Sequence, residues 1–252
     1  GGVVGTRFEN DSLELRTDFM LAEINGWHGA FTFDYKYSDF EAIGEEAFTP
    51  PSKTSSVALG LLEEKHFGNV LVQLGARVEQ VDIESNGFGE LAATDLSFTP
   101  MSLSIGAVYD FTDGYNAAIS YTHSSRAPSA AELLSFGPHI GTNSFEIGAL
   151  YELHEEHEEH DEHEAGHDAG HEEEHEVHLD ELFEPHPDGL EEETSNNIEL
   201  SLRKFEGNTG FTINAFYNRV NNFYYQENTG LFFEDAHEEH DEHEEEHGED
   251  HV

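Results

Sequence analysis

Apolar and polar residues alternate with a period of two along much of this chain. From Trp27 to Tyr37 the odd positions are mostly aromatic and the even positions are mostly polar. The same alternation recurs from Val70 to Val78, from Met101 to Tyr109 and from Phe211 to Tyr217. Successive side chains of a strand point to opposite faces, so this pattern predicts strands with one apolar and one polar face. The runs span about 10 to 14 residues, which suits membrane strands better than soluble strands of about 5 or 6.

The connections between the predicted strands alternate in length. We predict strands near residues 12–22, 27–38, 54–63, 69–83, 99–110, 115–124, 145–152, 195–205 and 211–225. When the shortest, 145–152, is set aside, tight turns containing Gly, Asp or Asn lie at 22–26, 63–68, 111–114 and 206–210. Long connections cover 39–53, 84–98, 125–194 and the chain from 226 onward. Short turns on one side and long loops on the other are typical of outer-membrane barrels. The prediction is therefore an all-β, antiparallel transmembrane β-barrel.

The extent of the sequence indicates a partial barrel. The chain opens with Gly1 and Gly2, shows no cleavable signal, and ends inside a histidine-rich stretch with no returning strand. Its longest apolar runs, such as 57–62, are far shorter than the roughly 20 residues of a membrane helix. We therefore interpret residues 1–252 as one domain, an internal piece of a larger barrel.

Charge changes the picture at two places in the chain. There are 55 acidic and 10 basic residues, for a net charge of -45, and 31 of the acids fall in segments 152–193 and 234–252, which contain no Lys or Arg. Nucleic-acid binding is excluded, because phosphate contacts require basic residues. The absence of cysteine excludes disulfide scaffolds, cysteine zinc sites and thiol catalysis.

The same two segments hold 14 of the 18 histidines. The repeats place histidines three or four residues apart, at His154, His157, His160, His163, His167, His171, His175 and His178, and at His237, His240, His243 and His247. Neutral imidazole is the commonest metal ligand, and the interleaved carboxylates add oxygen ligands and a negative field. This donor set suits zinc, and it also suits copper(II) and nickel, with copper binding more tightly. We expect these tracts to collect divalent cations by exchange among many similar sites.

Without metal, we expect both tracts to be disordered, largely solvated extracellular loops. Gly166, Gly170 and carboxylate repulsion all oppose a stable helix. A purely electrostatic role is the simpler alternative, but it gives no reason for the clustering of histidines. Catalysis requires fixed geometry, which such repeats lack, so we expect no enzymatic activity.

The segment after the strand at 115–124 carries a family signature. It contains Arg126-Ala127-Pro128-Ser129 followed by Glu132-Leu133, then Gly137-Pro138-His139 and Phe145-Glu146-Ile147-Gly148, and later Thr194-Ser195-Asn196-Asn197. This pattern resembles the TonB-dependent outer-membrane receptors, and with its histidine-rich insertions it looks most similar to the zinc-uptake members. The resemblance implies a monomeric receptor in the lipid bilayer of a Gram-negative outer membrane that imports zinc through the TonB energy-coupling system. Such receptors contain an N-terminal plug domain, which this sequence does not include.

The resemblance also singles out individual residues. It implies a discrete metal site at His139, completed by plug residues, with His123 as a second candidate ligand. We expect Glu132 to cap a short turn and Arg126 to pair with a carboxylate. His28 and His66 lie beside tight turns, on the wrong side for capture.

Two alternatives remain open. A haem-uptake receptor of the same family would use His139 as its haem ligand, although Ala149-Leu150-Tyr151 replaces the family's usual box after Gly148. The other alternative, from a different class, is a soluble acidic protein that buffers metal and carries an incidental β-domain.

Overall fold

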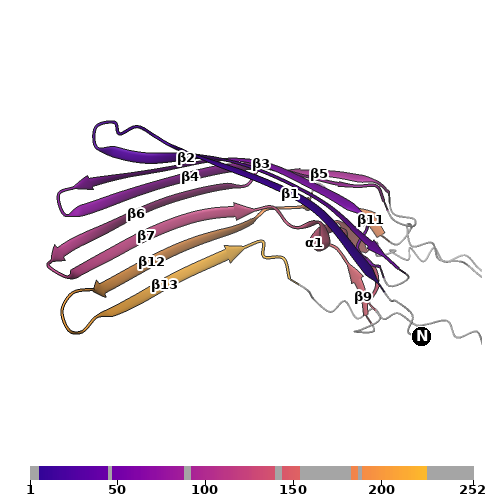
Figure 1. Ribbon diagram of the computed structural model, residues 1–252. Coiled ribbons are helices and arrows are strands. Elements are labelled where there is room, and N and C mark those ends of the chain that lie inside the picture. Colours follow the sequence, from indigo (N-terminus) through magenta and orange to yellow (C-terminus); the bar gives the residue numbers. More distant parts are fainter. Residues whose placement is uncertain are drawn as a thin grey trace, which may run out of the picture.

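A single antiparallel sheet dominates the structure (Figure 1). The computed structural model describes residues 6–44, 47–87, 92–139, 144–153, 183–186 and 189–225. Eight long strands follow one another in the order β1 (Arg7–Met20), β2 (Trp27–Ile43), β3 (Ser52–Phe67), β4 (Val70–Ser85), β6 (Met101–Thr112), β7 (Tyr115–Arg126), β12 (Glu193–Lys204) and β13 (Phe211–Asn221). A ninth strand, β5 (Thr94–Phe98), pairs with β4 beyond the start of β6. The eight predicted long strands are confirmed, and most are longer than expected.

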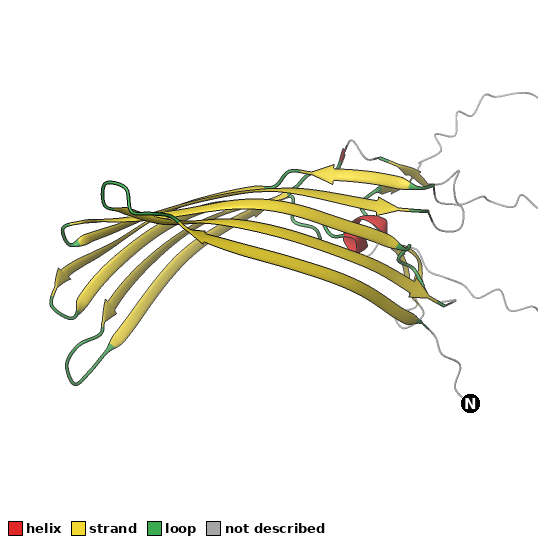
Figure 2. Cartoon of the chain, turned by 45° about the horizontal axis from the view of Figure 1, so that its top comes forward, coloured by secondary structure: helices red, strands yellow, loops and turns green. Residues whose placement is uncertain are grey.

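The two ends of the sheet differ in how the strands are joined. Four tight connections lie at one end, and the long connections lie at the other (Figures 1 and 2). In the first tight turn Asn25 and Gly26 have φ angles of 54° and 80°. Positive φ at both central residues is what a two-residue hairpin needs to match the strand twist. We call these the tight-turn end and the long-loop end.

Both histidine-rich tracts are connected to the long-loop end. Leu153 and Phe183 flank residues 154–182, and Tyr225 precedes residues 226–252. The tracts themselves lie outside the described residues, so their expected disorder stays a prediction. The flanking residues agree with the predicted arrangement, in which the long connections share one side.

The two faces of the sheet have opposite character. One row across four strands joins Phe33, Leu59, Val78 and Met101. On the same face, many large apolar side chains are exposed, for example Leu103, Ile105, Leu200 and Ile213, each at 50% or more. A continuous exposed apolar band of this kind is the lipid-facing surface of a membrane barrel. It does not pack into an enclosed core, as a soluble sandwich would require.

The opposite, concave face is polar. A neighbouring row joins Thr32, Gly60, Arg77 and Ser102 across the same four strands. The sequence-based fold class, an antiparallel transmembrane barrel wall, is therefore confirmed. Among the described residues, no helix is long and apolar enough to cross a membrane.

The predicted strand at 145–152 does not exist as one element. It is divided between β9 (Ser144–Ile147) and β10 (Tyr151–Leu153), and neither belongs to the large sheet. Between them the chain turns tightly at Gly148, where an added Cβ would overlap the backbone of Leu133. The Leu150 amide then donates to the Leu133 carbonyl at 3.1 Å. This close approach to a helix interrupts the strand.

These short elements form a small unit at the long-loop end, which we call the inner module. It comprises α1 (Ala130–Leu134), β8 (Phe136–His139), β9, β10 and β11 (Phe183–Pro185). Its core joins α1 and the β8–β10 region to the inward side of β4 and β5, through Ile83, Leu96, Phe98, Leu133, Leu134, Phe136, Leu150 and Tyr151. The inner module therefore covers part of the concave face (Figure 1).

The two-faced wall predicts a position-dependent response to charge. Ile105→Arg places a guanidinium in the middle of the apolar band and should destabilise the intact protein by about 2–4 kcal/mol. Ser104→Arg, one residue away on the polar face, should cost less than about 1 kcal/mol. Denaturant unfolding of both variants in lipid vesicles measures the difference. Equal losses for the two variants would contradict the assignment of faces.

Candidate functional site

The first histidine-rich tract is closed at its base by a short stem. In the stem β10 pairs with β11, with Tyr151 opposite Pro185 and Leu153 opposite Phe183. Just below, the His186 amide donates to the Leu150 carbonyl at 2.8 Å. Burial raises the pKa of the Tyr151 phenol, as expected for a ring inside the inner module. The two ends of residues 154–182 are thus held together on a packed base.

The inner module is fastened to the sheet by a charged cluster. Arg126, the last residue of β7, donates to both carboxylate oxygens of Glu132 at 3.0 Å. It also donates to Glu193, at the start of β12, at 3.2 and 3.0 Å. Bidentate guanidinium–carboxylate pairs are among the strongest and most directional polar contacts. One side chain therefore links two neighbouring strands to α1, which confirms the expected role of Arg126.

Glu132 has the expected capping role. The Ser129 hydroxyl accepts from the Glu132 amide at 3.2 Å, and the Glu132 carboxylate accepts from the Ser129 amide at 2.7 Å. This reciprocal capping box satisfies two backbone donors that a short helix otherwise leaves free. The Arg126 guanidinium, followed by these Ser129 contacts, holds the pKa of Glu132 below its ordinary value, against the opposing effect of burial.

The structure places the two singled-out histidines in different parts of the protein. The backbone of His139 lies in β8 of the inner module, opposite Ser144. His123 lies in β7, in register with Leu103, so it belongs to the apolar face. Its Nδ1 lies 3.0 Å from the Asn196 side-chain oxygen. The elements that carry these residues do not bring them to one face.

No metal site is visible in the described part of the chain, where no three potential ligands among His, Cys, Asp and Glu gather. The tract histidines, from His154 to His178 and from His237 to His247, lie outside it. His28 and His66 lie near the tight-turn end, as expected. A metal-collecting role for the tracts therefore rests on their sequence and on where they are attached.

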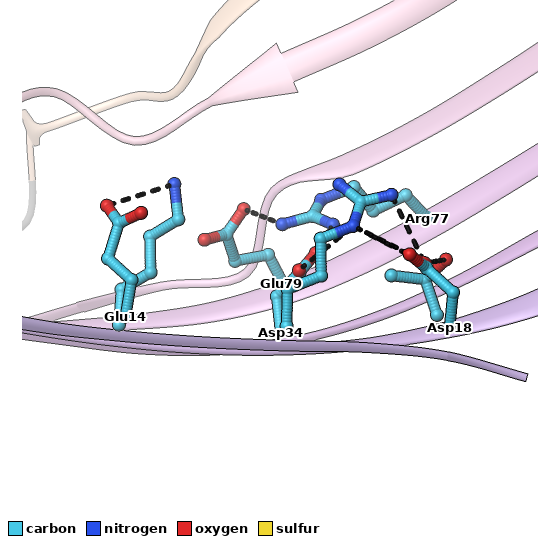
Figure 3. A network of polar contacts seen from close by, with 8 residues as sticks. Glu14, Asp18, Asp34, Arg77 and Glu79 are labelled. Carbon is cyan, nitrogen blue, oxygen red and sulfur yellow. Dashed lines mark hydrogen bonds and ion pairs between the residues drawn. The ribbon is translucent and has the colours of Figure 1, made fainter.

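The concave wall carries a charged network that the sequence reasoning missed (Figure 3). Arg77 of β4 pairs with Asp34 of β2 and donates to Glu79 at 3.3 Å. Between them, β3 presents only Ala58 and Gly60, so the guanidinium can reach across a whole strand. Asp34 is 7% exposed. The sequence does show charged residues at alternate positions of β2, Asp34 and Lys36. The partner of Asp34, however, can be identified only from the register of β2, β3 and β4.

A second part of the network continues onto β1. Arg16 donates to Asp18 at 3.3 Å and lies 3.9 Å from Asp34. The Thr32 hydroxyl donates to Asp18 at 2.7 Å. Together with the serines and asparagines of β6, β7 and β12, these charged groups make the inner wall polar, as in the lumen of outer-membrane barrels.

The Arg126 cluster predicts how firmly the inner module is held. Arg126→Gln removes both carboxylate pairs and should weaken the module by about 1 kcal/mol, because the cluster is partly exposed to solvent. Amide exchange at Leu133 and Leu150 should accelerate by roughly fivefold. The control is Arg7→Gln, whose partner Glu9 is on an exposed part of β1. Unchanged exchange in Arg126→Gln would refute the fastening role.

The lowered pKa of Glu132 predicts acid sensitivity with a definite sign. The carboxylate stabilises the module fully above its ordinary pKa of 4.5 and loses this effect as the pH falls from there through the lowered pKa. The protection of the Leu150 amide, measured relative to the intrinsic exchange rate at each pH, should therefore fall in this acid range. In Glu132→Gln this protection should be lower from the start and should lack the acid-dependent step. A step of the same size in both proteins would assign the acid effect to other groups.

Comparisons with known proteins agree with this architecture. The family described as "TonB dependent receptor-like, beta-barrel" matches residues 3–236. The chain is similar to the FrpB iron transporter from Neisseria meningitidis (F3-3 variant), with a TM-score of 0.53 and 9% identity over 85% of this chain and 28% of that one. It is also similar to a double mutant of the Serratia marcescens hemophore receptor HasR in complex with its hemophore HasA and heme. That TM-score is 0.59, with 12% identity over 86% of this chain and 34% of that one.

At these identities the two likenesses show the fold alone, and the chain spans 28% and 34% of the lengths of the two structures. The family match covers most of the chain. The chain therefore belongs to the TonB-dependent receptor β-barrel family, whose members are transport receptors of the Gram-negative outer membrane and not enzymes.

Proposed function

We propose that this chain forms the wall and capture loops of a receptor that collects zinc outside the cell for TonB-dependent import. The observation that carries the proposal is the attachment of both histidine-rich tracts to the long-loop end. In outer-membrane barrels the long loops are extracellular and the tight turns periplasmic. Both tracts would therefore meet the medium before any solute enters the barrel.

The chemistry of the tracts supports a divalent cation as the ligand. Imidazole nitrogens and carboxylate oxygens without thiolates form a donor set that suits zinc, and many equivalent sites favour rapid exchange. Copper and nickel share these ligands, so the tracts would concentrate the metal and a tighter site would select it. We place that tighter site at His139, completed by plug residues, because β8 belongs to the module on which the first tract stands.

His123 stays a prediction as a second ligand. Its ring would have to leave the Asn196 side chain and turn from the apolar face toward the inner wall. Haem is the second candidate cargo, with His139 as its axial ligand. A haem-bound receptor among the similar structures is compatible with this alternative, but haem gives no chemical reason for the clustered tract histidines. The exposed apolar band argues against a soluble metal buffer.

Replacing the histidines of both tracts with serine tests the capture role. Calorimetric titration should show most of the weak zinc sites lost, and zinc uptake at nanomolar supply should fall several-fold. The matched control replaces His28 and His66, which lie at the tight-turn end. Titrations with copper, nickel and haemin rank the possible cargoes. Unchanged uptake at nanomolar zinc would overturn the proposal.

Zinc capture should also depend on pH. Protons compete with zinc for imidazole nitrogen near pH 6.5, so binding to the tracts should weaken markedly between pH 7.5 and 5.5. In the serine-substituted protein the tracts keep only carboxylates as ligands, and these remain ionised across this range. The weak zinc binding that the tracts retain should therefore change little with pH. A similar pH profile in both proteins would assign zinc binding to groups other than the tract histidines.

A further inference from the structure

The lipid-facing surface contains an apolar hollow at the tight-turn end. It is lined mainly by Leu21, Ala22, Ile24, Trp27, Glu63 and Leu74. The Leu21 amide donates to the Gly29 carbonyl at 2.9 Å, and Glu63 lies opposite both Gly29 and Leu74. These residues thus share the outward face, where the first tight turn folds over β2 and β3. Ile24 is 68% exposed, so this surface needs an apolar neighbour.

A lysine lies at the rim of the hollow. Lys65 donates to the Asn25 carbonyl at 2.6 Å, and Asn25 is itself a lining residue. Its Nζ lies 5.0 Å from the ring centre of Phe67 and 5.8 Å from that of Trp27. An ammonium group has three donors, so two remain for a ligand after the contact with Asn25. Basic and aromatic side chains together are typical of the level of lipid headgroups.

A second charged group, the Glu63 carboxylate, lies beside this lysine on the same strand. Glu63 and Lys65 are two residues apart on β3, so they project from the same face at a spacing of ~6.6 Å. The Glu63 carboxylate lies over Gly29, where an added Cβ would overlap it. Within the described part of the chain, Glu63 makes no hydrogen bond and no ion pair. An unpaired carboxylate next to hydrocarbon is unfavourable, which calls for a cationic partner from outside the chain.

We propose that this hollow binds a phospholipid with a phosphoethanolamine headgroup, drawn from the leaflet at the tight-turn end. The phosphate accepts hydrogen bonds from Lys65, the ammonium donates to Glu63, and an acyl chain fills the apolar hollow. One headgroup can span the two side chains because its opposite charges lie a few bonds apart.

The two protein charges set the specificity among lipids. A phosphatidylglycerol would satisfy Lys65, but its headgroup carries no cation, so Glu63 would keep an unpaired charge beside the phosphate. A phosphatidylcholine carries a cation that has no N–H to donate, so Glu63 would keep an unmet hydrogen-bonding capacity. Of these three headgroups only phosphoethanolamine matches both side chains, its phosphate accepting from Lys65 and its primary ammonium donating to Glu63.

The test is native mass spectrometry of the intact protein with equimolar phosphatidylethanolamine, phosphatidylglycerol and phosphatidylcholine. We expect phosphatidylethanolamine to be retained preferentially. Lys65→Gln and Glu63→Gln should each reduce its retention by about tenfold, as for the loss of one charge-assisted contact. The control is Lys204→Gln, because Lys204 also lies over an aromatic ring, that of Tyr115 at 5.6 Å, but on another hairpin.

A second variant separates position from charge. Gly29→Ala keeps both charged groups but displaces the flexible end of Glu63, so it should lower phosphatidylethanolamine retention while sparing that of phosphatidylglycerol. Heat-modifiability on gels verifies that each variant is folded. Equal retention of the three lipids, preference for phosphatidylglycerol, or no effect of Glu63→Gln would each overturn the proposal. An effect of Lys204→Gln as large as that of Lys65→Gln would do so as well.

Discussion

Backbone hydrogen bonding between neighbouring strands is the constraint on which the rest of this structure depends. A chain that crosses hydrocarbon has no water to satisfy its amide and carbonyl groups, so each strand must pair along its whole length. The register here runs unbroken from β1 through β4 and from β6 to β13, apart from one irregularity near the end of β6. Once pairing is continuous, the face of every side chain is fixed by its parity.

The odd or even position of a residue along its strand then decides whether its side chain faces lipid or the concave side. The same alternation that sends Leu103 and Ile105 toward lipid sends Arg77 and Asp34 toward the concave side. Because strands reverse direction at every connection, all short turns come to one end and all long connections to the other. The inner module lies on the concave side of this sheet as a separate unit. Arg126 links it to the end of β7 and the start of β12. The apolar face, the polar face and the points where the histidine-rich tracts are attached are thus separated from one another around one sheet.

The sequence predicted the elements whose signal is local and repeated. The eight long strands, their faces and the role of Arg126 were accessible in this way, because alternation and turn residues are visible within a dozen positions. The inner module was not accessible. Its elements have three to five residues each, and its core joins Ile83 to Leu133 and Leu150, which are far apart in the chain. The side of His123 could have been inferred from its parity with Ile119 and Tyr121, which face lipid.

The stem formed by β10 and β11 has a consequence for how this protein can vary. Because the stem and the packed base of the inner module fix both ends of residues 154–182, the length of that segment is uncoupled from the geometry of the sheet. The entropy of closing such a loop grows only with the logarithm of its length, so each doubling costs about 0.6 kcal/mol. Repeats of the histidine-containing unit can therefore be gained or lost at almost constant stability. Under the proposed capture role, the number of metal ligands could therefore change without a change in the barrel wall.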